Sequence, residues 1–185
     1  EVIQAMEQSD RIVRPVNLLP PAPGKRWTVV PTKDNRHQVA VFCALGQMYM
    51  GNWNSPWPTV ARTMEEIPSD VKIRVVDFHA EASSEKMAMG HICDGRVSLV
   101  VGTHTHIPTA DAMILPKGTA YQTDAGMCGD YDSVIGMDKA LPIARFTRKL
   151  PTDRLFASQG PGTLCAVFIE TDDKTGLARR ISPLR

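Results

Sequence analysis

Three of the five histidines fall where two neighbouring strands are expected to end. His79 follows the apolar run from Val71 to Asp77. His104 and His106 follow the run from Arg96 to Gly102. Ligands of open α/β sheets bind outside the carboxyl ends of the strands, so we expect the three imidazoles to lie close together. Imidazole binds Zn, Fe, Ni and Cu, and also Mn where oxygen ligands share the site. This placement therefore predicts a metal site containing His79, His104 and His106.

The spacing of His104 and His106 adds a geometric expectation. In an extended segment, residues two apart point to the same side, so both rings should face one way. A histidine beside a strand also often serves as a hydrogen-bonded polar residue, and this alternative stays open for each of the three. We interpret His37, in a predicted turn, and His91, on a predicted helix, as surface or packing residues.

Several carboxylates are expected near these histidines. A ligating histidine usually donates its second N–H to a carboxylate or a carbonyl, which fixes the direction of the ring. We expect Asp77 and Glu81 to act in this way, although Asp77 capping the strand and Glu81 remaining solvated is an equal alternative. The Gly- and Asp-rich segment 124–136 is either a lid or a connector. The full set of candidate carboxylates is Asp77, Glu81, Glu85, Asp111 and Asp124.

Other chemistry is weakly supported. Residues 83–86 spell SxxK, but Ser83 is better interpreted as the N-cap of a helix than as a nucleophile. The sequence contains neither GxGxxG nor GxxxxGK[ST], so a phosphate-binding loop is not supported. The four cysteines are dispersed without a CxxC pair, which favours reduced, buried thiols over a zinc or redox site.

Composition limits the classes of protein. The 185 residues carry 21 Lys+Arg against 20 Asp+Glu. This balance argues against general nucleic-acid binding, which needs a basic face. No run approaches the roughly 18 apolar residues of a membrane span. We expect one domain over residues 1–185, a cytoplasmic location and a small-molecule partner.

The elements that position the histidines form a predicted βαβ unit. Strands over Val71–Phe78 and Arg96–Gly102 flank a helix from Ser83 to Cys93, which predicts a parallel pair within an α/β layered fold. Three hairpins are also predicted: Trp27–Val30 with Gln38–Leu45, Ile114–Leu115 with Thr119–Thr123, and Leu164–Glu170 with Leu177–Ile181. Further helices are predicted near the N-terminus, from Pro58 or Thr59 to Ile67, and over Leu141–Lys149.

Four segments in this order carry a family pattern. They are DFHAEA (77–82), DGRVS (94–98), VVGTHTH (100–106) and GTAYQTDAGM (118–127). Together they resemble the YmdB-type bacterial metallophosphoesterases, a branch of the calcineurin-like superfamily. The resemblance extends from Arg14 to Met137.

The resemblance implies a fold and an activity. The fold is an α/β/β/α sandwich around a two-metal centre, and the activity is phosphodiester hydrolysis of cyclic nucleotides, notably 2′,3′-cyclic ones. By motif, His106 belongs to the first metal, and His79 and His104 belong to the second. The two divalent metals would be Fe, Mn or Zn, and a bridging hydroxide would attack phosphorus.

The sequence departs from the family pattern at its start. The GDxxG, GENxA and GNHxWD segments, which supply the remaining ligands and a histidine that assists the leaving group, do not occur in the 185 residues. We therefore expect the opening strands of the fold to be missing, and we assign no catalytic residue. Exposed strand edges and apolar faces should make the isolated chain prone to aggregate or to depend on a partner, and a homo-oligomer is compatible with the sequence. Two alternatives stay open: a single-metal, three-histidine hydrolase, and a non-catalytic remnant of the fold.

Overall fold

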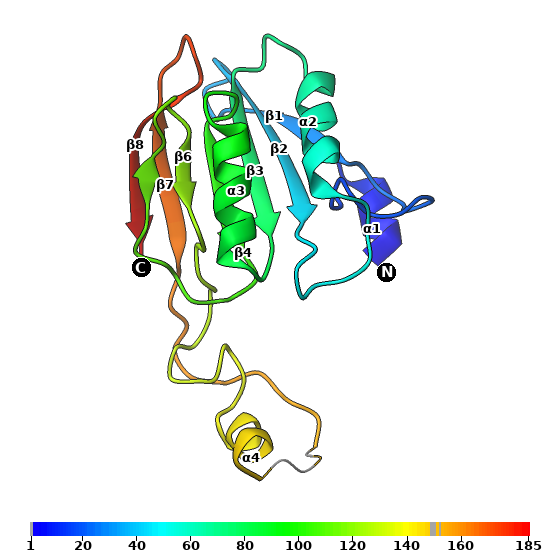
Figure 1. Cartoon of the computed structure of the whole chain (residues 1–185), viewed down its shortest axis with the longest axis vertical. Helices are drawn as coiled ribbons and strands as arrows, with labels where there is room; N and C mark the ends of the chain where they lie inside the picture. The colour runs from blue at the N-terminus through cyan, green and yellow to red at the C-terminus, as the bar shows by residue number, and fades with distance from the viewer. Residues whose placement is uncertain (1, 149–150, 152) are drawn as a thin grey trace.

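A six-stranded sheet forms the centre of the molecule (Figure 1). The computed structural model describes residues 2–148, 151 and 153–185. Strands β2, β3, β4 and β6 run parallel to one another, and β1 and β5 pair antiparallel at the two edges. The strands in their spatial order are β1 (Trp27–Pro31), β2 (Gln38–Leu45), β3 (Ile73–His79), β4 (Leu99–Thr103), β6 (Ala120–Gln122) and β5 (Met113–Ile114).

Two helices cover one face of this sheet. They are α2 (Pro56–Glu66) and α3 (Ser83–Cys93), which Figure 1 shows side by side in front of the strands. Alternate strand residues, among them Phe42, Val76 and Phe78, are fully buried beneath the helices. Because side chains alternate between faces along a strand, Asp77 and His79 point to the opposite face.

A two-stranded hairpin packs on that opposite face. It consists of β7 (Ala166–Thr171) and β8 (Ala178–Leu184). Val167, Ile169 and Ile181 pack against a small cluster around Leu99 and Ala120 of the central sheet. The described residues thus form helix, sheet and sheet layers, which is the α/β architecture that the sequence predicts. Helices α1 (Val2–Gln8) and α4 (Ala140–Arg148) lie outside these layers (Figure 1).

The elements agree with the sequence predictions in type and order. The parallel β3–α3–β4 unit and all three hairpins are confirmed. One detail is wrong: the N-cap of α3 is Ala82, Ser83 is already helical, and no side chain caps the helix. The predicted helix end at Lys149 lies outside the described residues.

The segment after β6 leads away from the sheet. Figure 1 shows it descending beyond the carboxyl ends of β2 and β3 to α4, which stands apart from the layers. Segment 124–136 is the start of this connection. Within the described part of the chain, no helix has the length and apolar character needed to cross a membrane.

Candidate active site

The carboxyl ends of β3 and β4 bring His79 beside Thr103. The two residues are register partners, and the His79 Nδ1 atom lies 3.0 Å from Thr103 Oγ1. The same hydroxyl donates to Asp77 Oδ1 at 2.7 Å. Asp77 therefore reaches His79 through Thr103, and not by accepting the N–H of the histidine directly as the sequence prediction has it.

This chain of hydrogen bonds selects one tautomer of His79. The Thr103 hydroxyl has a single proton, and it donates that proton to Asp77, so it accepts a hydrogen bond from His79 Nδ1–H. The Nε2 atom of His79 then carries the lone pair. Burial, and next the neighbouring His104, lower the pKa of His79, which keeps the ring neutral near pH 7.

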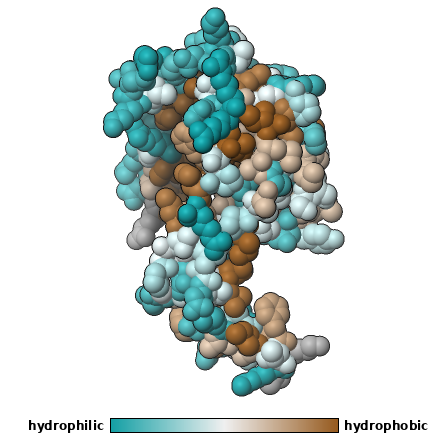
Figure 2. Space-filling view, turned by 90° about the vertical axis from the view of Figure 1, so that its left-hand side faces the viewer, coloured by the Kyte–Doolittle hydropathy of each residue, from teal (hydrophilic) through white to brown (hydrophobic). Residues whose placement is uncertain are grey.

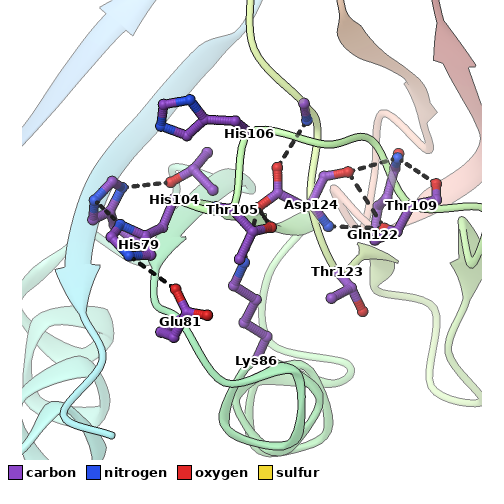
Figure 3. A network of polar contacts seen from close by, with 12 residues as sticks. His79, Glu81, Lys86, His104, Thr105, His106, Thr109, Gln122, Thr123 and Asp124 are labelled. Atoms are coloured by element: carbon purple, nitrogen blue, oxygen red, sulfur yellow. Dashed lines mark hydrogen bonds and ion pairs between the residues drawn. The ribbon is translucent and has the colours of Figure 1, made fainter. Parts of the chain in front are cut away.

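His104 faces the free nitrogen of His79 (Figure 3). Its Nδ1 atom lies 3.1 Å from His79 Nε2, and its Nε2 atom lies 3.1 Å from Glu81 Oε2. Two imidazole nitrogens bound at about 2.1 Å to one tetrahedral Zn²⁺ are about 3.4 Å apart. The facing nitrogens of His79 and His104 are close to this spacing and could serve as two ligands of a single divalent cation after a small shift, with Glu81 behind the second ring.

His106 takes a different direction. Its Nδ1 atom lies 3.0 Å from the carbonyl oxygen of Ile135. The prediction of an extended His104–His106 segment is wrong: both residues have positive φ, 101° and 68°, so the chain turns here. Within residues 2–148, 151 and 153–185, no group of three or more His, Cys, Asp or Glu side chains is arranged to hold a metal ion. The structure brings His79 and His104 together, and His106 stands beside them on the same loop.

A buried ion pair lies beneath this loop (Figure 3). Lys86 Nζ of α3 is 2.9 Å from Asp124 Oδ2, and both side chains are 1% exposed. The backbone N–H and the hydroxyl of Thr105 donate to the same carboxylate oxygen, at 3.1 and 2.7 Å. Burial alone would raise the pKa of Asp124, but the hydrogen bonds from Lys86, Thr105 and Gly126 outweigh it and hold that pKa below its usual value.

The other two candidate carboxylates do not reach the histidines. Glu85 accepts hydrogen bonds from the backbone N–H groups of Gln47 and Met48, and so holds the loop after β2. Asp111 accepts from Thr123. His37 lies 3.7 Å from Asp173, and His91 is exposed on α3, in line with the roles expected for them.

The role of Lys86 was missed at the level of the sequence, although a signal was present. Lys86, Met89, Gly90 and Cys93 recur at the spacing of one helix face. Met89, Gly90 and Cys93 are suited to the core, so the same periodicity places Lys86 there. A fully buried lysine requires an anionic partner, and Asp124 fills that role.

Comparison with known proteins identifies the family of this chain. The chain matches the model of a family described as YmdB-like protein over residues 1–184. It is 42% identical over 181 residues to a 2′,3′-cyclic-nucleotide 2′-phosphodiesterase of Bacillus subtilis (strain 168), covering 98% of this chain and 67% of that protein.

Solved structures show the same fold. A crystal structure of a hypothetical protein from Thermus thermophilus superposes with a TM-score of 0.91 at 38% identity, over 100% of this chain and 70% of that one. A crystal structure of a novel phosphatase from Mycoplasma pneumoniae gives a TM-score of 0.88 at 31% identity, over 98% of this chain and 65% of that one. The chain thus spans about two thirds of the length of these proteins, and it belongs to the YmdB-like protein family.

Proposed function

We propose that this chain carries part of the active site of a metal-dependent phosphodiesterase that hydrolyses 2′,3′-cyclic nucleotides. The observation that carries the proposal is the pair of facing ring nitrogens, His79 Nε2 and His104 Nδ1, at the carboxyl edge of a parallel sheet. The identity to a 2′,3′-cyclic-nucleotide 2′-phosphodiesterase supports the substrate class.

Each residue of the site has a defined task in this proposal. His79, held neutral and oriented through Thr103 and Asp77, presents the Nε2 lone pair, and His104 presents Nδ1 while Glu81 faces its other nitrogen. His106, on the same loop as His104, is proposed as a ligand of a second ion. Divalent cations at such a site supply charge stabilisation for the phosphoryl oxygens and an activated water. No described residue is assigned as the acid that protonates the leaving oxygen.

The contact of His106 leaves one of its ring nitrogens for a metal ion. Its Nδ1–H donates to the carbonyl oxygen of Ile135, which is the second contact typical of a ligating histidine, so Nε2 carries the lone pair. The family resemblance assigns His106 to a different ion from His79 and His104, and we therefore propose two ions, Fe, Mn or Zn, over the single-metal alternative. Elemental mass spectrometry of the chain, purified without chelators after supplying the three metals, tests the count. About two metals per chain support the proposal, and about one metal per chain supports the three-histidine hydrolase. A chain purified without any bound metal would contradict a metal site in this chain alone.

Turnover tests the activity itself. The chain is incubated with 2′,3′-cyclic AMP and each metal in turn, and phosphorus NMR identifies the product. Cleavage of the ester bond at the 2′ oxygen should release the 3′-monophosphate, and EDTA or His104→Ala should abolish the release. His37→Ala, at the opposite end of the sheet, is the matched control and should retain turnover. No turnover by a chain that has bound about two ions per molecule would favour the non-catalytic remnant.

A further inference from the structure

The loop that carries His104 and His106 is held in an unusual backbone conformation. Both histidines have φ in the left-handed region, where a residue with a side chain is disfavoured. Such a conformation persists only when surrounding contacts impose it. Thr105, the residue between the two histidines, makes contacts that impose this conformation.

The restraint on Thr105 comes through one carboxylate oxygen. The backbone N–H and the hydroxyl of Thr105 both donate to Asp124 Oδ2, and the same oxygen also accepts a hydrogen bond from Lys86 Nζ. The second oxygen, Oδ1, accepts the N–H of Gly126. Asp124 thus joins α3, the histidine loop and the segment after β6, and Figure 3 shows Lys86 extending from the helix towards Thr105 and Asp124.

Backbone contacts extend the same attachment to both ends of the loop. The N–H of Ala125 donates to Gly102 O at 3.0 Å, and the N–H of Met127 donates to His106 O at 2.8 Å. The segment that begins at Asp124 therefore borders the histidine loop from its first residue to its last. Lys86 is the only cation among these contacts, and it connects the histidine loop and the segment that begins at Asp124 to the core helix α3.

We propose that the buried Lys86–Asp124 pair is the positioning element of the histidine loop, setting the directions of His104 and His106 through Thr105. The inference rests on the proposed function insofar as these directions matter for metal binding. A pair with a purely structural role would stabilise the core without directing the loop. The two roles differ in what happens when both charges are removed together.

The test compares three variants: Lys86→Met, Asp124→Leu and the double variant. Each single variant leaves one unpaired charge in the core and should lower the melting temperature strongly, whereas the double variant removes both charges and should recover part of that loss. The loop cannot recover in the double variant, because the Thr105 N–H and hydroxyl still lack their acceptor. We therefore expect the double variant to regain stability without regaining the loop geometry.

Two readouts report on the loop. The histidine ring signals in heteronuclear NMR respond to ring environment without metal or substrate, and those of His104 and His106 should be displaced in the double variant. Affinity for Mn²⁺, measured by electron paramagnetic resonance, should fall by about 10- to 100-fold, as is typical when a residue behind a ligand is lost. Val60→Ala, on the buried face of α2, supplies a control with lowered stability and an unaltered loop.

The outcomes separate the two proposals. Wild-type ring signals in the double variant, or displacements no larger than those of Val60→Ala, would overturn the positioning role. If the wild-type chain binds no Mn²⁺ while the ring signals still move as expected, the proposed function fails and the positioning role stands.

Discussion

Thr103 decides which nitrogen of His79 is available to a ligand. Its hydroxyl donates to Asp77 and accepts from His79, so the two contacts fix the tautomer together. Neither residue alone would do so, since a carboxylate two residues earlier on the same strand does not reach the ring. The link between Asp77 and His79 depends on β4 pairing in register with β3.

Replacing Thr103 by Val should therefore weaken metal binding without disturbing the strand. Valine keeps the branched shape and the strand preference of threonine but loses the hydroxyl. We expect the affinity for Mn²⁺ to fall by about 10-fold or more. Isothermal titration of the variant with Mn²⁺ measures this change. Thr103→Ser, which retains the hydroxyl, is the control, and equal affinities for the Val and Ser variants would contradict the assigned role.

Asp124 makes a prediction about acid stability. The pKa of Asp124 is below its usual value in the folded chain, whereas the pKa of an aspartate in an unfolded chain is about 3.9. Near pH 4 the unfolded chain therefore binds more protons than the folded one, so the stabilisation is complete above about pH 5 and is lost as the pH falls through the lowered pKa. Asp124→Asn should flatten the decline of the unfolding free energy between about pH 5 and 3.

The same variant also tests the pairing itself. At pH 7 Asp124→Asn leaves the Lys86 ammonium buried without a counter-ion and should cost about 3–5 kcal/mol of unfolding free energy. Urea unfolding at a series of pH values measures both effects. A curve parallel to that of the wild type at every pH would show that Asp124 does not titrate as expected.

Among the elements, β4 approaches the segment after β6 so closely that only glycine fits at residue 102. A Cβ atom added to Gly102 would lie 1.7 Å from the backbone oxygen of Thr123 and 2.9 Å from Lys86 Cδ. Backbone cannot yield as a flexible side chain does. This approach is what allows Asp124 to reach both the histidine loop and α3.

Gly102→Ala should accordingly destabilise the chain by about 3 kcal/mol or more, which is at or above the usual range for overpacking. Gly162→Ala is a matched control, because an added Cβ there meets no atom within 4 Å. Thermal unfolding of both variants measures the loss of stability. Similar melting temperatures for the two would mean that β4 and the segment after β6 separate more easily than this packing indicates.

The elements were predictable from the sequence because their signals are local. Apolar runs and turn residues placed the β3–α3–β4 unit and the three hairpins within a few residues of their observed bounds. The site was predictable only as far as strand ends determine it: His79 and His104 meet as expected. The turn at His104–His106 and the burial of Lys86 depend on Asp124, about 20 and 40 residues further along the chain, and no local pattern records such a contact.

For the molecule as a whole, the hairpin β7–β8 has one covered face and one open face. Val167, Ile169 and Ile181 pack against the central sheet. On the other face, Phe168 and Leu184 are 45% and 48% exposed. Figure 2 shows hydrophobic residues running down this side of the molecule towards the α4 segment. A two-stranded sheet also leaves strand edges with unpaired backbone groups, which favours association between copies.

We therefore expect the chain to self-associate through the outer face of β7–β8. Phe168 and Leu184 supply the exposed apolar area for such a contact, and the ion pair of Glu170 and Arg180 lies on the same face. Replacing Phe168 and Leu184 together by Ser should shift the chain towards monomer, as measured by sedimentation velocity at micromolar concentration. Phe146→Ser is the matched control, since Phe146 is 79% exposed but lies on α4, away from the hairpin. If Phe146→Ser dissociates the assembly and the hairpin variant does not, the contact lies on α4. If the unaltered chain is a monomer with a cooperative melt, the expectation of self-association is wrong.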